Sequence, residues 1–112
     1  FINGDGNDYL DFTYIKDLCQ GVKLVIESKD SINETFNLTY GESKKIADLI
    51  EILKNNFNNI EVEYKERDKF NPKRGTLNID KAKKLLGYNP SYPIDIGYNH
   101  YINWYKEFWK KK

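Results

Sequence analysis

The sequence predicts an α/β fold with a few strands and three to four helices. Apolar residues recur at intervals of three and four in several stretches, as they do on one face of an amphipathic helix. Short stretches rich in β-branched and aromatic residues separate these helical patterns and are typical of strands. Alternation of the two patterns along 112 residues favours one α/β domain over an all-helical or all-strand fold.

The first helical pattern covers residues 15–26 and follows a glycine-rich opening. Its apolar positions are Ile15, Leu18, Cys19, Val22, Val25 and Ile26. Offsets of three and four place these side chains on one face. Cys19 is the single cysteine, so no internal disulfide and no cysteine-based metal cluster can form. We expect it to be a buried structural thiol and not a nucleophile.

The middle of the chain alternates strand and helix signals. Residues 34–40 (ETFNLTY) predict a strand that ends at Gly41. Ser43 is a predicted N-cap for a helix that runs to about Asn56. The alternating residues 60–64 (IEVEY) predict a second strand.

A charged loop over residues 65–73 leads to a strand-like segment over residues 74–79. Asp80 is predicted to cap a short helix, residues 81–86, which Gly87 closes. The last helix begins near Ile94 and combines an aromatic-rich face with a polar face.

Two strands cannot make a self-sufficient doubly wound sheet, because isolated strand pairs are only marginally stable. We therefore expect the predicted strands to join strands from elsewhere in a longer protein or from a partner chain. The chain begins at Phe1 and contains no Met, and we read it as a piece of something longer. Alone, it is expected to be unstable or to oligomerise through unpaired strand edges.

The composition argues against several partners. The 18 basic and 17 acidic residues leave a net charge of +1, so neither nucleic acid nor an anionic membrane is expected. We interpret Lys110–Lys112 as a solvated basic tail. No run approaches the roughly 18 apolar residues of a membrane span, and no signal peptide is visible. A cytoplasmic location is expected.

Motifs for metals, cofactors and catalysis are incomplete. His100 is the only histidine and is expected to be packed or on the surface, not a metal ligand. Residues 5–8 (DGND) suggest a calcium loop, but Lys16 stands where a glutamate is required. Residues 4–6 (GDG) lack the third glycine of a dinucleotide loop, since Tyr9 stands there. We therefore predict no catalytic, metal or cofactor residue in this chain.

Residues 4–17 (GDGNDYLDFTYIKD) resemble the Gly-x-Gly … Arg-Asp-Phe-x-Tyr-Val-x-Asp motif of the NAD-dependent epimerase/dehydratase family. These are extended short-chain dehydrogenases that act on nucleotide sugars. Residues 36–38 (FNL) are similar to the family's Phe-Asn-Ile/Leu strand. Residues 79–90 are similar to its Asp-x-x-Lys-Ala-x-x-x-Leu-Gly-Trp/Tyr-x-Pro segment. A closing amphipathic helix with Trp104-Tyr105 completes a resemblance that covers essentially the whole chain.

The resemblance implies that residues 1–112 are the C-terminal, substrate-binding part of an NAD(P)-binding Rossmann-like enzyme of carbohydrate biosynthesis. It implies a nucleotide-diphosphate sugar as ligand, and the chain's own N-terminal half or a homo-oligomer as partner. NAD and the catalytic Tyr-x-x-x-Lys pair would belong to the absent N-terminal half. Whether this fragment is itself an enzyme stays open, as does the choice between epimerase (isomerase) and dehydratase (lyase).

Residues that bind the diphosphate are sought among the arginines, whose guanidinium donates two parallel hydrogen bonds to phosphate oxygens. The family has one such arginine just before its Asp-Phe, where this sequence has Leu10. For the second, we favour Arg74, with Lys73 beside it, and Arg67 stays open. The resemblance also places Asn3 in the segment beside the nucleobase. Exposed loop cations without a ligand are the competing interpretation.

Tyr40 and Lys44 have the spacing of the catalytic pair, but Gly41 turns the chain between them. We interpret this stretch as a strand-to-helix turn. Asp11, Tyr14 and Asp17 are expected to be structural, capping and orienting the first helix. The alternative to a substrate-binding part is a non-catalytic interaction module, favoured by Leu10, the missing catalytic half and the aromatic last helix.

Overall fold

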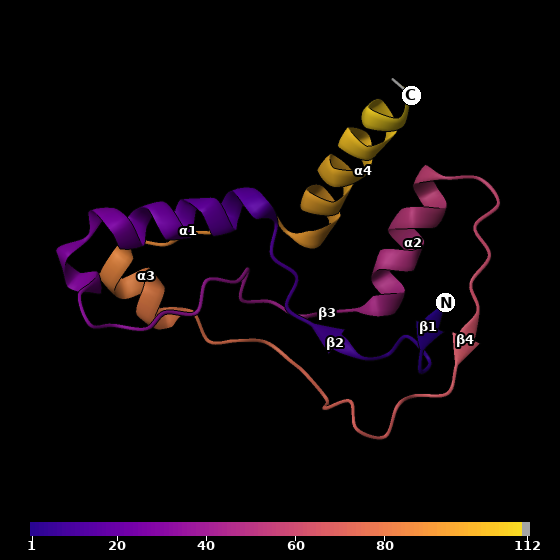
Figure 1. Cartoon of the computed structure of the whole chain (residues 1–112), viewed down its shortest axis with the longest axis horizontal. Helices are drawn as coiled ribbons and strands as arrows, with labels where there is room; N and C mark the ends of the chain where they lie inside the picture. Colours follow the sequence, from indigo (N-terminus) through magenta and orange to yellow (C-terminus); the bar gives the residue numbers. More distant parts are fainter. Residues whose placement is uncertain (111–112) are drawn as a thin grey trace.

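The computed structural model of the protein describes residues 1–110, which form four helices, four very short strands and one 3-10 turn (Figure 1). The helices are α1 (Ile15–Glu27), α2 (Ile46–Asn56), α3 (Asp80–Leu86) and α4 (Ile94–Lys110), and the 3-10 turn is η1 (Lys29–Ser31). The strands are β1 (Ile2–Asn3), β2 (Tyr9–Leu10), β3 (Lys44–Lys45) and β4 (Tyr64–Lys65). Of the predicted basic tail, Lys111 and Lys112 lie outside the described residues.

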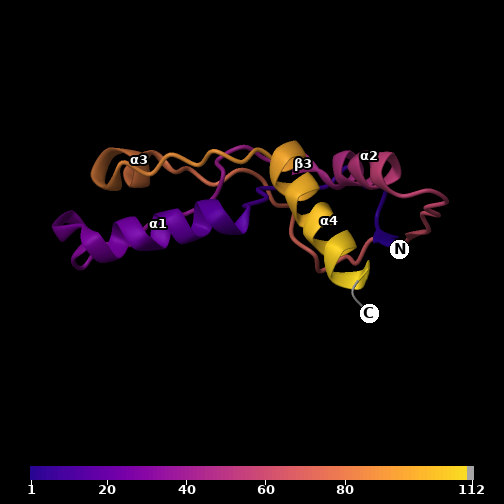
Figure 2. The same ribbon diagram turned by 90° about the horizontal axis from the view of Figure 1, so that it is seen from above.

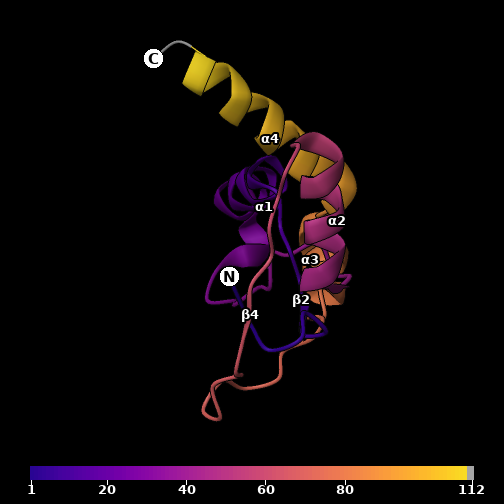
Figure 3. The ribbon, with the colours of Figure 1, turned by 90° about the vertical axis from the view of Figure 1, so that its right-hand side faces the viewer.

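The helices form two pairs at opposite ends of a flat molecule (Figures 1 and 2). α1 lies beside α3 at one end, and α2 contacts α4 at the other. Figure 3 shows the last turns of α4 extending beyond the other elements. The four helices confirm the helical patterns predicted from the sequence.

Two strand pairs connect distant parts of the chain. β1 runs parallel to β4, with Ile2 opposite Tyr64, and the amide of Gly4 donates to the carbonyl of Lys65 at 2.8 Å. β2 runs antiparallel to β3, with Leu10 opposite Lys44. The first pair places the amino-terminal residues beside the loop that follows β4.

The strand predictions were largely wrong. Of residues 60–64, only Tyr64 is in a strand, and residues 34–40 and 74–79 form none within the described structure. A strand exists only where a neighbour supplies ladder hydrogen bonds, and these segments meet no such neighbour. Their composition indicated a preference for extended structure but not a partner.

Two predicted helix caps were also wrong. α2 begins at Ile46 and not after Ser43, and its first turn is closed by Asp48, whose Oδ2 accepts from the amide of Lys45 at 2.9 Å. Asp80 is already inside α3, and Asn78 Oδ1 accepts its amide at 2.8 Å. The predicted stop of α3 is confirmed, because Gly87 adopts the left-handed φ of 66° that a C-cap needs.

The larger core cluster lies between α1 and α3. Its buried members are Ile79, Ala82, Leu86 and Tyr88, with Leu24, Val25, Phe36 and Leu38 packed against them. Gly21 permits this packing, since a Cβ at that position would lie 2.9 Å from Leu38 Cδ2. At the other end, Ile50 of α2 and Ile102 of α4 are buried.

A buried carboxylate fixes α1 to the connection between α3 and α4. Asp17 is 2% exposed, and its two oxygens accept the amides of Ser91 and Tyr92 at 2.8 and 3.0 Å. The predicted structural role of Asp17 is thus confirmed, but the predicted capping is not. Tyr14 stands at the N-cap position of α1 without a side-chain cap, and Asp11 bonds other segments.

The prediction that Cys19 is buried was wrong. Cys19 is exposed, as are its neighbours Ile15, Leu18, Val22 and Ile26 on the same flank of α1. The periodicity correctly indicated an apolar flank, but no described element covers it.

The chain is more open than a compact domain of the same length. Its radius of gyration is 16.7 Å, against about 13 Å for a compact domain of this length. Its accessible surface is 8393 Å², against about 6,500 Å² for a folded monomer of this mass. The predicted instability or oligomerisation of the isolated chain stays a prediction, and these dimensions favour it. No helix within residues 1–110 is long and apolar enough to cross a membrane.

Replacing Asp17 with Ala is expected to lower the free energy of unfolding by about 3 kcal/mol, because two partly buried amides lose a charged acceptor. Chemical denaturation of the chain, or of any longer protein that contains it, measures this loss. Asp95→Ala is the matched control, since Asp95 is exposed in the first turn of α4. Equal losses for the two variants would contradict the role assigned to Asp17.

Tyr88 predicts a pH dependence of stability. Its hydroxyl is buried without a hydrogen-bond partner in the described structure, and burial, with Asp17 and Asp11 nearby, raises its pKa to about 12. The folded state thus holds the phenol proton more tightly than the unfolded state, whose pKa is about 10. This stabilisation is complete below pH 10 and is lost as the pH rises to 12.

The free energy of unfolding should therefore fall by about 2–3 kcal/mol more in the wild type than in Tyr88→Phe between pH 9 and 12. Denaturant titrations of both proteins across this range measure the difference. Parallel curves would show that Tyr88 does not ionise with a raised pKa.

Candidate functional site

The candidate site is a pair of adjoining hollows between the amino-terminal segment and the loop after β4. They measure about 320 and 500 Å³ and share Asp8, Tyr9, Arg67 and Arg74 in their linings. We call the two together the Arg67 hollow. The parallel pairing of β1 with β4 forms it, because that pairing brings residues 1–10 against residues 66–74.

All four residues predicted to bind substrate line the Arg67 hollow. Asn3, Arg67 and Arg74 line the smaller part, and Lys73 lines the larger part together with both arginines. Asn3 is more than 60 positions from the others in the sequence, and the pairing of β1 with β4 brings it close to them in space. Their juxtaposition is a structural fact, whereas their roles in binding stay predictions.

Arg67 is the best held of these cations. Its Nε donates to Asp8 Oδ2 at 3.0 Å, and its aliphatic carbons lie close to Gly4. Its Nη2 is buried and has no hydrogen-bond partner in the described residues. A buried guanidinium N–H without an acceptor costs free energy, so this nitrogen is an unsatisfied donor within the described structure.

Arg74 and Lys73 differ from Arg67 in both burial and partners. Both are exposed, and neither makes a hydrogen bond or ion pair with the residues that the structure describes. They add positive charge to the hollow without a fixed side-chain position. Geometry therefore ranks Arg67 above Arg74, the reverse of the preference drawn from the sequence.

Carboxylates limit the positive charge of the hollow. Asp8 is paired with Arg67, and Asp5 accepts hydrogen bonds from the amide and side chain of Asn7. These bonds lower the pKa of Asp5 below its ordinary value and keep it ionised. The three cations thus exceed the two carboxylates by one charge, which suits a small anion.

Leu10 also lines the smaller part of the hollow, beside Arg67 and Arg74. This is the position at which the resemblance places an arginine. The aliphatic side chain supplies apolar contact there and no donor. The hollow consequently presents fewer charged donors to a ligand than the family pattern implies.

An aromatic surface borders the same hollow. Phe1 is 79% exposed, and the ammonium of Lys65 lies 4.1 Å from the centroid of its ring. Phe1, Ile2 and Asn3 together line one side of the smaller hollow. This side offers an apolar plane next to a polar side chain.

The glycine turn does not form a dinucleotide-binding loop. Gly4 and Gly6 both have positive φ, 88° and 79°, and the turn between them leads into β2. The pyrophosphate of a dinucleotide is bound where such a turn opens a helix. Because α1 begins only at Ile15, these residues do not fit NAD in that manner.

The other motifs considered from the sequence form no reactive site. Lys44 lies in β3 and is ion-paired with Glu42, so Tyr40 and Lys44 do not share a helix, as predicted. His100 is exposed, and its ring makes T-shaped contacts with the rings of Tyr14 and Tyr92. Within residues 1–110, no group of three or more His, Cys, Asp or Glu residues is placed to hold a metal ion.

Sequence reasoning missed Asp8 as the partner of Arg67. The two residues are 59 positions apart, and the calcium-loop pattern at residues 5–8 did not indicate the pairing. In a chain with 17 acidic residues, opposite charge alone carries no information about pairing. Only the register of β1 against β4 would have indicated it.

The fold is that of the C-terminal portion of Rossmann-like extended short-chain dehydrogenases that act on nucleotide sugars. An epimerase from Methanothermobacter thermautotrophicus is similar with a TM-score of 0.91 and 29% identity, covering 97% of this chain and 33% of that chain. The UDP-glucuronic acid 4-epimerase of Bacillus cereus, solved in complex with UDP-glucuronic acid and NAD, is similar with a TM-score of 0.85 and 29% identity. That similarity covers 96% of this chain and 35% of that one.

Among curated proteins, a UDP-glucuronate 4-epimerase from Thermodesulfobacterium geofontis is 36% identical over 108 residues, which cover 95% of this chain and 33% of that protein. No family model matches the chain. The relatives and structural neighbours are nucleotide-sugar epimerases and dehydratases of the NAD-dependent type, so the resemblance seen in the sequence is confirmed. The chain spans about a third of the length of the curated relatives it matches.

Adding a cation at Leu10 tests what the hollow can hold. We expect Leu10→Arg to tighten binding of inorganic pyrophosphate at least tenfold, because each charge-assisted hydrogen bond contributes about 1.5–3 kcal/mol. Isothermal titration calorimetry measures the affinity. Ile32→Arg adds the same charge at an exposed residue outside the hollow and should have little effect. A similar gain in both variants would indicate only non-specific attraction.

Proposed function

We propose that this chain is the substrate-binding part of an NAD-dependent nucleotide-sugar epimerase or dehydratase. In this proposal the Arg67 hollow binds the diphosphate of the nucleotide sugar. Another part of the enzyme holds NAD and the catalytic tyrosine and lysine. The chain itself contributes binding and orientation of the substrate.

The observation that carries this proposal is that Arg67, whose Nη2 has no hydrogen-bond partner among the described residues, lines a hollow together with Arg74 and Lys73. Asp8 occupies Nε and orients the guanidinium, which leaves the terminal nitrogens for the ligand. A diphosphate matches this arrangement because its oxygens accept parallel hydrogen bonds from a guanidinium. The nucleobase would lie toward Phe1 and Asn3, at the other side of the smaller hollow.

Similarity to proteins with known ligands supports the substrate class. The neighbour from Bacillus cereus was solved with UDP-glucuronic acid and NAD. A UDP-glucose 4-epimerase from Thermotoga maritima, at 28% identity and a TM-score of 0.84, was solved with UDP-glucose. A nucleoside diphosphate linked to a hexose or hexuronic acid is therefore the ligand class that we propose.

A non-catalytic interaction module derived from the same fold is the second candidate. Leu10 and the Asp8–Arg67 pair favour it, because both reduce the number of donors available to a diphosphate. The large exposed aromatics Tyr101 and Trp104 of α4 offer surface for a protein partner. Measured affinity for nucleotide sugars separates the two candidates.

The test is a calorimetric titration with UDP-glucuronic acid, UDP-glucose and their dTDP and GDP counterparts, using the chain or a longer protein that contains it. We expect Arg67→Ala to weaken the binding of the preferred nucleotide sugar more than tenfold, because a buried charged donor is lost. Arg74→Ala is the matched control and should weaken it less than threefold, since Arg74 is exposed.

Two results would change this assignment. If Arg74→Ala has the larger effect, the diphosphate is bound by the exposed arginine that the sequence favoured. Binding of none of the nucleotide sugars would reject the substrate-binding function and support the interaction module.

A further inference from the structure

Among the described residues, Asp8 is the one carboxylate that lines both parts of the Arg67 hollow. Its side chain is 32% exposed, against 30% for Arg67, so both charges are partly shielded from water. In such surroundings a charge acts on a neighbouring charge more strongly than it does in bulk water. Asp8 is therefore placed to influence any anion that enters the hollow.

The Asp8 carboxylate is fixed from two directions. The carbonyl of Asp8 accepts the amide of Ile46 at 3.1 Å, and the next two residues form β2 against β3. The side-chain Oδ2 accepts from Nε of Arg67 at 3.0 Å. The carboxylate thus cannot turn away from the hollow without the loss of this ion pair.

The second oxygen of this carboxylate has no partner within the fold. No described residue donates a hydrogen bond to Oδ1 of Asp8. The buried side-chain atoms without a partner are Nη2 of Arg67 and the hydroxyl of Tyr88, so Oδ1 of Asp8 is not one of them. This oxygen is therefore accessible to a molecule in the hollow.

The charge of a nucleoside diphosphate depends on whether a sugar is attached to it. A terminal phosphate monoester has a second pKa of about 6 and carries about 1.5 to 2 negative charges at pH 7. In a nucleotide sugar this phosphate is a diester and has lost the second ionisable oxygen. A free nucleoside diphosphate or triphosphate consequently brings additional negative charge to the same side chains.

Additional ligand charge meets the carboxylates of the hollow. A phosphate that is hydrogen-bonded to Arg67 lies close to Asp8, because these two side chains are themselves 3.0 Å apart. The cations Arg67, Arg74 and Lys73 balance the first charges of the ligand. Asp8 opposes each further charge, and Asp5 adds less because it is exposed and screened by solvent.

We propose that Asp8 is a specificity-determining residue of the Arg67 hollow. Its charge lowers the affinity for anions with a free terminal phosphate more than the affinity for a diphosphate that is esterified at both ends. The inference rests on the proposed function, since it concerns the selectivity of the same hollow. Asp8 then has two effects, because it holds Arg67 in place and opposes a ligand with excess charge.

A purely structural role for Asp8 is the competing explanation. In that case the acceptor for Nε of Arg67 matters and the charge of Asp8 does not. Asn has nearly the same shape as Asp and still offers an oxygen to Nε, but it carries no charge. Asp8→Asn therefore separates the two explanations.

The test is a calorimetric titration of the chain, or of a longer protein that contains it, with UDP-glucose, UDP, UTP and inorganic pyrophosphate. We expect Asp8→Asn to tighten the binding of UTP and pyrophosphate at least tenfold and that of UDP-glucose less than threefold. The physical reason is that the repulsion removed grows with the charge of the ligand.

Two variants serve as controls. Asp68→Asn removes the same charge from the same loop, at an exposed residue that lines neither part of the hollow. It should change each affinity less than twofold, because solvent and salt screen an exposed charge. Asp8→Glu keeps the charge and should leave the ratio of UTP to UDP-glucose affinity within threefold of the wild type.

The proposal is overturned if Asp8→Asn leaves the ratio of UTP to UDP-glucose affinity unchanged, since Asp8 then acts only by holding Arg67. Equal gains in Asp68→Asn would indicate a long-range charge effect and overturn it as well. If Asp8→Asn does not fold, Asp8→Ser is judged by the same ratio. Failure of both variants to fold would assign Asp8 to the fold alone.

A failure of this inference is distinguishable from a failure of the proposed function. If no protein binds UDP-glucose, the proposed function is rejected, and the gain in pyrophosphate affinity of Asp8→Asn over Asp68→Asn decides the role of Asp8. If UDP-glucose binds and the ratio does not change, the substrate-binding function stands and the selectivity assigned to Asp8 is rejected.

Discussion

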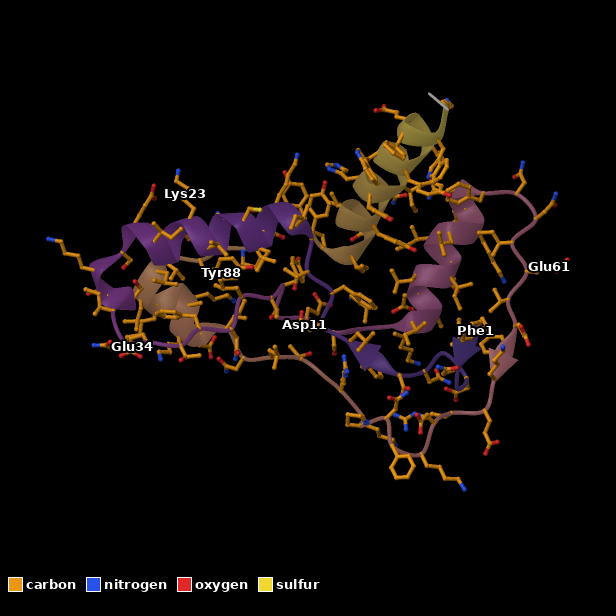
Figure 4. The ribbon with its side chains drawn as sticks, viewed as in Figure 1. Phe1, Asp11, Lys23, Glu34, Glu61 and Tyr88 are labelled. Carbon is orange, nitrogen blue, oxygen red and sulfur yellow. The ribbon has the colours of Figure 1, made fainter. Side chains whose placement is uncertain are left out.

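The carboxylate of Asp11 is the interaction on which the arrangement of this chain depends. One oxygen accepts from Thr39 Oγ1 and the amide of Leu77, and the other accepts from the amide of Gly41, all at 2.9–3.1 Å. Three segments far apart in sequence thus meet at one side chain, which Figure 4 shows in the middle of the molecule, between the two helix pairs. Asp17 acts in the same way, because its carboxylate accepts two amides of the connection between α3 and α4.

Although these carboxylates hold the segments together, few of the apolar side chains are buried. Ile50 and Ile102 are the buried hydrophobics of the α2–α4 end, and a small cluster around Tyr88 serves the α1–α3 end. Polar hydrogen bonds, and not a large apolar core, hold the segments together at the centre of the molecule. One apolar flank of α1 stays exposed. The same polar centre, together with the β1–β4 pair, keeps the loop of Arg67 against the amino-terminal segment.

The Arg67 hollow and the exposed apolar flank of α1 lie in different regions of the molecule. The Arg67 hollow is formed where the pairing of β1 with β4 holds two loops together. Asp8 holds the Arg67 side chain there, and Nη2 of Arg67 has no hydrogen-bond partner among the described residues. The exposed flank of α1 consists of Ile15, Leu18, Val22 and Ile26, which no described element covers.

Local sequence determined the four helices and the glycine stop of α3, because apolar periodicity and a left-handed C-cap are properties of neighbouring residues. It also indicated the residues of the Arg67 hollow, through motifs that resemble a family. Tertiary structure alone decided the caps at Asp48 and Asn78, the exposure of Cys19, and the pairing of Asp8 with Arg67. The physical reason is that burial and pairing depend on which distant segments of the chain pack against a residue. Residues 34–40, for example, have the composition of a strand, but no described segment pairs with them.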